Sequence, residues 1–253
     1  MPLRDVIEPP LATDAFTHLP HLRNRVTRAE NSELRVTPEV LAFWDQRARK
    51  LGRAADWRLT DQELEASRLA VLGPLDAGED LWIYSYGSLM WDPGIHFVEV
   101  RLAELAGHQR RFSYRTTLGR GTPECPALML SLEPCAGSCR GLVFRVGADV
   151  ADAESAVVWR REMIRGGYRP KLLPVSTPQG DVTALAFASN PSHADYVGEL
   201  SLIETAAMIA NATGVLGTNR HYLEQLAAQL ENLGIEDAYV QNLAEQVQGI
   251  AGP

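Results

Sequence analysis

The sequence contains few cysteines, almost no lysine and no long apolar run. Its cysteines, Cys125, Cys135 and Cys139, are odd in number, which speaks against a disulfide framework. The Cys-x3-Cys pair could be combined with His96 or His108 into a zinc site, but the spacing is irregular and no second cysteine pair exists. We therefore expect neither a structural disulfide nor a bound metal.

The absence of long apolar runs and of a basic surface narrows the possible partners. No run approaches the ~18 to 20 apolar residues needed to span a bilayer, and the N-terminus lacks an apolar core of signal-peptide length, so we expect a cytoplasmic protein. The formal net charge of −8 argues against nucleic acid or an anionic membrane as a partner, because both require a basic surface. A small molecule is the expected partner, and the sequence leaves the oligomeric state open.

The basic residues are unevenly chosen. Only Lys50 and Lys171 are lysines, and the other 22 of the 24 basic residues are arginines. The planar guanidinium suits carboxylates, so the bias fits a substrate that carries a carboxylate. A GC-rich genome would produce the same bias, so the arginines alone assign no function.

Residues 1–78 are expected to form an N-terminal extension. Residues 1 to about 35 mix proline, polar and charged residues without periodicity, so we expect them to be irregular or loosely docked. Thr37 before a proline indicates a helix start, and Thr60 before two acidic residues indicates another. The expected helices run from Pro38 to near Gly52 and from Asp61 to Leu72, before Gly73-Pro74.

Residues 79–250 are expected to form the main domain. Short β-type runs separated by Gly and Pro indicate a curled sheet or small β-barrel, and the helical segments place the chain in the α+β class. After a first strand from Leu81, the β-type runs are Phe97–Leu102, Arg110–Arg115, Ala127–Leu132, Gly141–Val146, Lys171–Ser176 and Val182–Ala188. The helical segments are Val150–Arg165, Leu200–Asn211, Asn219–Leu233 and Asp237–Gln248.

The stretch Leu81–Trp91 is an apolar, aromatic-rich run that stops at Gly87-Ser88. It predicts a buried strand followed by a tight turn, whose successive N–H groups can form an anion-binding nest. A plain strand-to-loop turn needs the same residues. Ser88 could also be a nucleophile, but no Gly-x-Ser-x-Gly elbow surrounds it and no Ser-His-Asp order is apparent.

Glu162 lies on the stripe of the Val150–Arg165 helix that is expected to face inward. Burial and the C-terminal end of the helix before Gly166 both disfavour its charged form, which would raise its pKa toward that of a general base. An ion pair with a nearby arginine would lower the pKa instead. The residues sharing its face are Ala151, Ser155, Val158 and Trp159, while Glu154, Arg161 and Arg165 lie on another.

Three further residues could touch a ligand. Tyr168 follows a pair of glycines, Tyr196 follows an Asn-Pro turn, and Arg120 lies in a polar loop that could reach a carboxylate. Each also has an ordinary structural explanation, because tyrosines beside glycines are usually packed residues and a polar loop needs no ligand.

These pieces occur together, and in the order found here, in the ChaC-type γ-glutamylcyclotransferases, which the chain resembles from about Leu81 to Leu233. The shared motifs are Tyr86-Gly87-Ser88-Leu89 with Trp91, the Arg-Gly-Thr-Pro loop at Arg120, Arg-Glu followed by Gly-Gly-Tyr168, Asn-Pro before Tyr196, and Gly-x-x-Gly-x-Asn-x-x-Tyr-Leu at 214–223. Ser85 departs from the Gly or Ala more usual there, and residues 1–78 lie outside the shared pattern.

The resemblance implies a small β-barrel flanked by helices and the cyclisation of the γ-glutamyl group of glutathione to 5-oxoproline, with release of Cys-Gly and no metal or cofactor. It puts the catalytic glutamate at Glu162, which would take a proton from the substrate α-amine and return it to the leaving amine. The loop N–H groups would bind either a substrate carboxylate or the oxyanion. The implied substrate-binding residues are Ile83, Tyr84, Ser85, Tyr86, Gly87, Ser88, Leu89, Arg120, Tyr168 and Tyr196.

Two alternatives stay open at this point. A cyclotransferase for other γ-glutamyl amides or amines would use the same residues. A non-catalytic ligand-binding module on the same fold would keep the loop but would need no carboxylate, so Glu162 on the inward stripe weighs against it.

Overall fold

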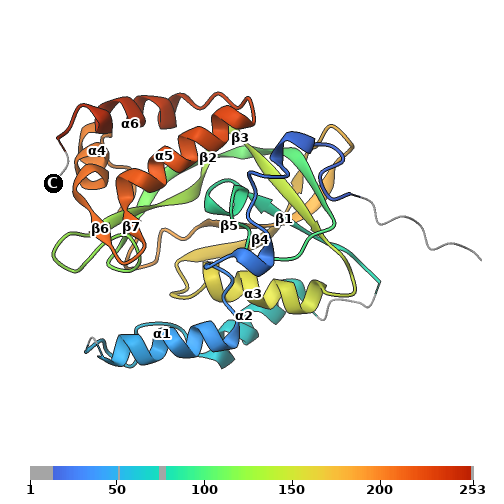
Figure 1. Ribbon diagram of the computed structural model, residues 1–253, viewed down its shortest axis with the longest axis horizontal. Helices are drawn as coiled ribbons and strands as arrows, with labels where there is room; N and C mark the ends of the chain where they lie inside the picture. Colours follow the sequence, from blue (N-terminus) through green and yellow to red (C-terminus); the bar gives the residue numbers. More distant parts are fainter. Residues whose placement is uncertain (1–13, 51, 74–77, 252–253) are drawn as a thin grey trace, which may run out of the picture.

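A five-stranded mixed sheet lies between two groups of helices in the computed structural model, which describes residues 14–50, 52–73 and 78–251. The strand order is β2-β3-β1-β5-β4; β1 runs parallel to β5, and the other neighbours are antiparallel (Figure 1). The strands are β1 (Leu81–Ser85), β2 (Glu99–Thr116), β3 (Ala127–Val146), β4 (Tyr168–Val175) and β5 (Val182–Ser189).

Strands β2 and β3 are each longer than the sequence pattern predicts. The four short runs expected between residues 97 and 146 join into two strands, which remain paired across a register shift at Ala106/His108 and another at Phe112/Tyr114. Gly107, at a φ of 75°, occupies the first of these irregularities. A bulge of this kind bends a strand without ending it, so turn-forming residues inside β2 and β3 do not interrupt the pairing.

The described strands do not form a closed sheet. Its two edges approach at one point, where Glu104 of β2 forms an isolated bridge with Ser176, the residue after β4. The structure therefore establishes an α+β fold with a strongly curled sheet, and the fully closed barrel expected from the sequence is not found.

The two faces of β1 pack against different layers. Tyr84 and Tyr86 belong to the core cluster that is covered by α4, α5 and α6, whereas Ile83 packs in the cluster that contains Trp159 of α3. This alternation is the period of two that a strand buried on both faces requires. The helices are α1 (Pro38–Lys50), α2 (Asp61–Leu72), α3 (Ala151–Glu162), α4 (Leu202–Asn211), α5 (Asn219–Asn232) and α6 (Ala238–Gln248), and a small hairpin is formed by β6 (Thr213–Gly214) and β7 (Gly217–Thr218).

Helices α1 and α2 lie where the sequence predicts them. Thr60 caps α2 with a capping box, in which its side chain accepts from the Glu63 N–H and the Glu63 side chain accepts from the Thr60 N–H. This reciprocal arrangement satisfies two N–H groups that a helix start otherwise leaves unpaired. All six helices agree with the expected segments to within a few residues.

The expectation of loose docking is wrong for residues 14–36. This segment contains two short 3-10 helices, and the side chains of Leu22 and Val36 are fully buried. Figure 1 shows it running down one side of the sheet toward α1. Residues 1–13, the remainder of the segment expected to be irregular, lie outside the described residues.

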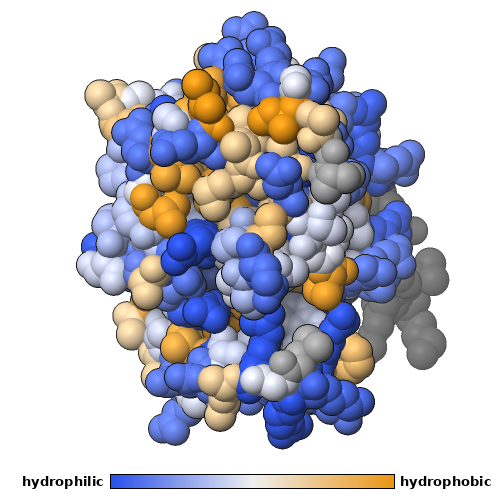
Figure 2. Space-filling model, turned by 90° about the vertical axis from the view of Figure 1, so that its left-hand side faces the viewer, coloured by the Kyte–Doolittle hydropathy of each residue, from blue (hydrophilic) through white to orange (hydrophobic). Residues whose placement is uncertain are grey.

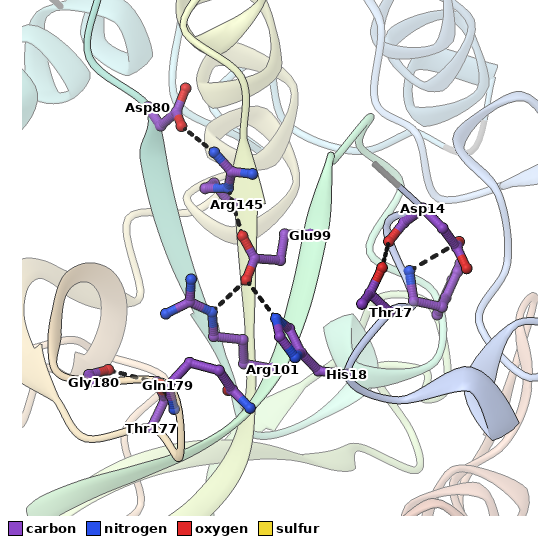
Figure 3. Close-up of polar contacts among 11 residues, drawn as sticks. Asp14, Thr17, His18, Asp80, Glu99, Arg101, Arg145, Thr177, Gln179 and Gly180 are labelled. Atoms are coloured by element: carbon purple, nitrogen blue, oxygen red, sulfur yellow. Dashed lines mark hydrogen bonds and ion pairs between the residues drawn. The ribbon is translucent and has the colours of Figure 1, made fainter. Parts of the chain in front are cut away.

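A chain of ion pairs joins this segment to the sheet (Figure 3). Glu99 of β2 contacts His18 at 3.1 Å, Arg101 at 2.5 Å and Arg145 at 2.8 Å. Arg145 also pairs with Asp80 at 2.7 Å. Burial opposes the charge of Glu99, but the contacts with Arg101, Arg145 and His18 together outweigh it and lower its pKa.

None of the helices in the described part of the chain combines the length and the apolar character that crossing a membrane requires. Figure 2 shows separate apolar patches set among hydrophilic side chains on one face of the molecule. The most exposed apolar side chains are Ile203, Val215 and Phe43.

Candidate active site

The site is organised around the loop that follows β1. Tyr86 is buried at the end of this strand, where its hydroxyl donates to the Phe187 carbonyl at 2.9 Å and its carbonyl accepts from Arg110 Nε at 3.0 Å. The chain then turns through a short 3-10 helix, Ser88–Met90, whose last N–H donates to the Gly87 carbonyl at 2.8 Å. The end of the strand is thus held by the contacts of Tyr86, and the turn that follows is closed by its own hydrogen bond.

Gly87 is required by a close approach and not by a left-handed backbone. Its φ is −136°, outside the region that only glycine tolerates. A Cβ added here would lie 3.1 Å from the Tyr222 hydroxyl and 3.3 Å from a Leu130 methyl group. The missing side chain therefore leaves room for Tyr222, which comes from α5, far along the chain.

Arg161 connects the loop to the end of α3. Its guanidinium donates to Ser88 Oγ at 2.8 Å and to the Asp92 carbonyl at 2.6 Å, and its Nε lies 3.2 Å from Glu162 Oε1. The hydroxyl of Ser88 is thus bonded to a permanent cation, which cannot act as a base. This geometry gives no support to a serine hydrolase triad.

Glu162 ends α3 with its carboxylate facing the loop side of the sheet. Its face of the helix is buried as the sequence predicts, with Ser155 and Val158 at 0 % exposure, while 16 % of the Glu162 side chain stays exposed. Burial raises its pKa above the ordinary value and Arg161 opposes that shift. The two opposing influences considered above, burial and an arginine ion pair, are both present, and burial dominates.

The second face of α3 is more enclosed than a solvated helix face. Glu154 is nearly fully buried and pairs with Arg35 of the N-terminal segment, and the side chain of Arg161 is also largely buried. The N-terminal segment and the loop cover this face, which the helix sequence by itself does not reveal.

Tyr222 is a site residue that was not singled out from the sequence. Its phenol lies against Gly87. Burial and then the charge of Glu162 raise its pKa to about 12, although the Ser88 N–H acts in the opposite direction by stabilising the ionised form. The guanidinium of Arg120 lies 5.5 Å from the centre of its ring. The signal for it is present in the sequence, because Tyr222 is the tyrosine of the 214–223 motif.

Arg120 reaches the same place from the loop between β2 and β3. It is half-buried and donates to the Thr218 carbonyl at 2.8 Å and to Gln225 Oε1 at 3.4 Å. Among the residues that the structure describes, it forms no ion pair with a carboxylate. A cation without an anionic partner is available to an anionic ligand.

The two predicted tyrosines occupy different positions. Tyr168 is buried, donates to the Leu130 carbonyl at 2.9 Å, and has its pKa raised by burial and by the charge of Glu162. Tyr114 separates it from Tyr196, with ring centres 5.3 Å and 5.4 Å away. Tyr196 donates instead to Glu133, a carboxylate that also accepts from three serines, Ser113, Ser131 and Ser189.

The strand residues before the loop have side chains that face the core. Ile83 is 1 % exposed, and Tyr84 donates to the Cys139 carbonyl at 2.6 Å. The buried Ser85 hydroxyl has no hydrogen-bond partner among the described residues. Leu89 is also buried. Any contribution of these four side chains to a ligand site is through packing behind the loop.

The cysteines are free, and they do not gather into a metal site. Cys139 is buried, whereas Cys125 and Cys135 are partly exposed. Across residues 14–50, 52–73 and 78–251, no three histidine, cysteine, aspartate or glutamate side chains are grouped as metal ligands.

Comparison with known proteins finds a matching family model and several similar proteins. The family model described as ChaC-like protein matches residues 81–250. A glutathione-specific γ-glutamylcyclotransferase of Escherichia coli is 35 % identical over 188 residues, which cover 74 % of this chain and 81 % of the relative. The human glutathione-specific γ-glutamylcyclotransferase 1 is 30 % identical over 158 residues, 61 % of this chain and 71 % of the relative.

A solved structure has a similar fold. The crystal structure of a γ-glutamyl cyclotransferase specific to glutathione from yeast superimposes with a TM-score of 0.62 at 22 % identity, covering 67 % of this chain and 96 % of the yeast chain. At that identity the likeness establishes the fold alone.

Proposed function

The chain belongs to the ChaC-like family, and from this membership we propose that it cleaves glutathione by cyclising the γ-glutamyl group to 5-oxoproline, releasing Cys-Gly. The similarity to the Escherichia coli and human enzymes supports the substrate. One structural observation carries the chemistry: Glu162, a carboxylate with a raised pKa, lies beside the Gly87-Ser88 loop and is held there by Arg161.

In the proposed reaction the α-amine of the γ-glutamyl group attacks the γ-carbonyl carbon of the same residue. Glu162 takes the proton from the ammonium group, and its raised pKa makes the carboxylate a stronger base than an ordinary glutamate. The new C–N bond closes a five-membered ring, the bond to the cysteine nitrogen breaks, and Glu162 returns its proton to that leaving nitrogen. The ring nitrogen gives up its remaining extra proton through solvent to the released amine, so the products are 5-oxoproline and Cys-Gly with an ammonium group. Ring closure is fast once the reactive rotamer is held, because the nucleophile is intramolecular.

The loop and Tyr222 surround the position where charge would develop. The N–H groups of the Gly87–Leu89 turn can donate either to a substrate carboxylate or to the tetrahedral oxyanion. The phenol of Tyr222 is neutral near pH 7, as an ordinary tyrosine is, and can serve as a hydrogen-bond donor; its pKa, raised to about 12 by burial, keeps it protonated at higher pH as well. Arg120, without a carboxylate partner among the described residues, is suited to hold a carboxylate at the other end of the substrate.

The remaining substrate-binding assignments follow from the same proposal. Tyr86 and Tyr168 are assigned to the substrate side of the loop, with their hydroxyls held by the Phe187 and Leu130 carbonyls; burial raises the pKa of both phenols, and the charge of Glu162 raises it further. Tyr196 lies one ring farther away and acts through Tyr114 and Glu133. Ile83, Tyr84, Ser85 and Leu89 support the loop from the core side.

We also infer the organisation and setting of the enzyme. Residues 1–78 form an extension and residues 79–250 the catalytic domain, a division supported by the start of the family match at residue 81. The curled sheet corresponds to a small barrel left open at one seam. We keep the expectation of a cytoplasmic location, and we expect catalysis without metal or cofactor.

Incubation of the purified protein with glutathione tests the proposal. We expect stoichiometric 5-oxoproline and Cys-Gly, with turnover unchanged by a metal chelator. Parallel incubation with γ-Glu-Ala tests substrate choice, because a cyclotransferase for other γ-glutamyl amides would process it at least as fast as glutathione. Failure to release 5-oxoproline from either compound would contradict the proposal.

A further inference from the structure

The N-terminal segment contacts both elements that carry the candidate site. Residues 27–35 lie outside the part of the chain that the family model matches. They bind the loop that contains Ser88 and they bind α3, which contains Glu162. The contacts on each side are short, and several involve buried groups.

On the loop side, the segment holds the residues directly after the 3-10 turn. The Thr27 N–H donates to the Trp91 carbonyl at 2.8 Å, and Ser32 Oγ donates to the Asp92 carboxylate at 2.6 Å. Gly94 has a φ of +65°, and a Cβ there would lie 3.2 Å from the Leu34 carbonyl oxygen. The close approach of segment and loop therefore depends on a glycine at this position.

On the helix side, Arg35 binds Glu154 of α3 with two parallel hydrogen bonds of 2.6 Å and 2.8 Å. The same guanidinium donates to the Gly94 carbonyl at 2.9 Å. Glu154 also accepts from the His96 N–H at 3.1 Å, and its side chain is only 3 % exposed. One arginine thus bridges the loop and the helix, using the fork geometry that a lysine lacks.

The segment itself is anchored well enough to transmit this constraint. Leu22 and Val26 are buried in the main core cluster, and His18 pairs with Glu99 on β2 (Figure 3). The backbone of Ala15 accepts from the Val100 N–H at 3.0 Å. These contacts attach the segment to the sheet that also holds β1 and its loop.

We propose that Arg35 is a positioning residue for the active site, and that residues 27–35 act as a clamp that fixes the loop from Gly87 to Gly94 against the first turn of α3, the helix that ends at Glu162. The kinetic consequence of the clamp rests on the proposed function, in which Glu162 and the loop act on one substrate. Loosening the clamp should slow the chemical step more than it weakens ground-state binding, since a displacement on the order of 1 Å can cost about 10²-fold in rate.

The matched pair Arg35→Lys and Arg58→Lys tests this proposal. Arg58 is a bidentate partner of Asp45 at 2.7 and 2.8 Å and donates to the Leu59 carbonyl, so it resembles Arg35 in kind but contacts neither the loop nor α3. We expect Arg35→Lys to lower kcat about tenfold with KM changed less than about twofold. Arg58→Lys should lower the melting temperature by about as much as Arg35→Lys does, but should leave kcat within about twofold of wild type.

Ser32→Ala provides a second variant, which removes a neutral hydrogen-bond donor to Asp92 without removing a charge, and should lower kcat severalfold. Amide hydrogen exchange gives a readout independent of turnover: peptides covering residues 86–94 and 155–164 should exchange faster in Arg35→Lys and not in Arg58→Lys. If wild type turns over no γ-glutamyl compound, the proposed function fails, and the exchange data alone decide about the clamp.

Three results would overturn the clamp. The first is unchanged kcat in both Arg35→Lys and Ser32→Ala, or in Ser32→Ala alone if Arg35→Lys does not fold. The second is an equal loss of kcat in Arg58→Lys, which would reduce the effect to general destabilisation. The third is exchange of the 86–94 and 155–164 peptides at the wild-type rate in the Arg35 variant.

Discussion

Glu162 is subject to two opposing influences at the end of α3, and burial exceeds the attraction of Arg161. A carboxyl group whose pKa is raised on folding binds its proton more tightly in the native state than in the unfolded chain. Its ionisation therefore costs stability as pH rises from the unfolded value toward the folded one, and this cost persists at neutral pH. The site thus gives up stability for a base of useful strength.

Removing the charge of Arg161 should move the activity profile toward higher pH. In the proposed reaction the base form of Glu162 is required, so activity should be lost as pH falls through its folded pKa; without the cation that pKa rises further. We expect the acid limb of kcat/KM in Arg161→Gln to shift upward. Arg160→Gln, its neighbour on α3, is the control, and an unshifted limb in Arg161→Gln would contradict the role assigned to the ion pair.

Ser85 has a buried hydroxyl without a partner in the described part of the chain. An unpaired buried hydroxyl costs about 1–3 kcal/mol, so Ser85→Ala should leave stability unchanged or raise it. Ser113→Ala is the contrast, because Ser113 donates to Glu133 at 2.5 Å and its removal should destabilise. Denaturant unfolding compares the two, and a clear loss of stability in Ser85→Ala would show that the hydroxyl has a partner.

Within the loop, Gly87 should matter more than Ser88. Removing the Ser88 hydroxyl deletes one bond to Arg161, costing about 1–3 kcal/mol, or roughly ten- to a hundredfold in rate. A Gly87→Ala side chain would press on the Tyr222 hydroxyl at 3.1 Å, so in a Tyr222→Phe background the further loss caused by Gly87→Ala should be smaller than in the wild type. Steady-state 5-oxoproline release measures all of these variants. A Ser88→Ala loss on the order of 10⁶ would instead indicate a nucleophile.

The elements differ in how far their sequences determine them. Helix α2 could be predicted closely, because its capping box and its glycine stop are local signals. The continuity of β2 and β3 could not, because Gly107 and Pro134 are turn residues locally and only pairing with the opposite strand keeps them inside the sheet.

The residues of the site also differ in how far the sequence predicts their positions. Glu162 could be placed on the inward face of its helix from periodicity alone. The burial of Glu154 could not be foreseen, since its partner Arg35 is 119 residues away in sequence and the helix pattern gives no sign of the covering segment. The position of Tyr222 against Gly87 likewise depends on how α5 packs onto the loop.

For the whole molecule, ion pairs on the sheet predict weakening in acid. Glu99 has a lowered pKa because its cations outweigh burial, so its stabilising effect is present above the unfolded pKa and is lost as pH falls through the folded one. Asp45 and Glu65 have pKa values lowered by Arg58 and Arg68 in the same direction. The melting temperature should fall below about pH 4.5.

Glu99→Gln separates this contribution from the others. We expect the variant to melt below wild type at pH 7 and the gap to narrow toward pH 3, where the wild-type carboxylate becomes protonated. Glu104→Gln, on the same strand with an exposed side chain, should show no such narrowing. A gap for Glu99→Gln that stays constant with pH would contradict the ion-pair explanation.

The most direct test of the whole account is the conversion of glutathione by Glu162→Gln. The amide keeps the shape of the side chain and loses its basicity, so kcat should fall ~10²–10⁴-fold while calorimetry still detects glutathione binding. The variant should be at least as stable as wild type at pH 7, because the buried charge is gone. Release of 5-oxoproline within a few-fold of the wild-type rate would contradict the assignment of Glu162 as the general base.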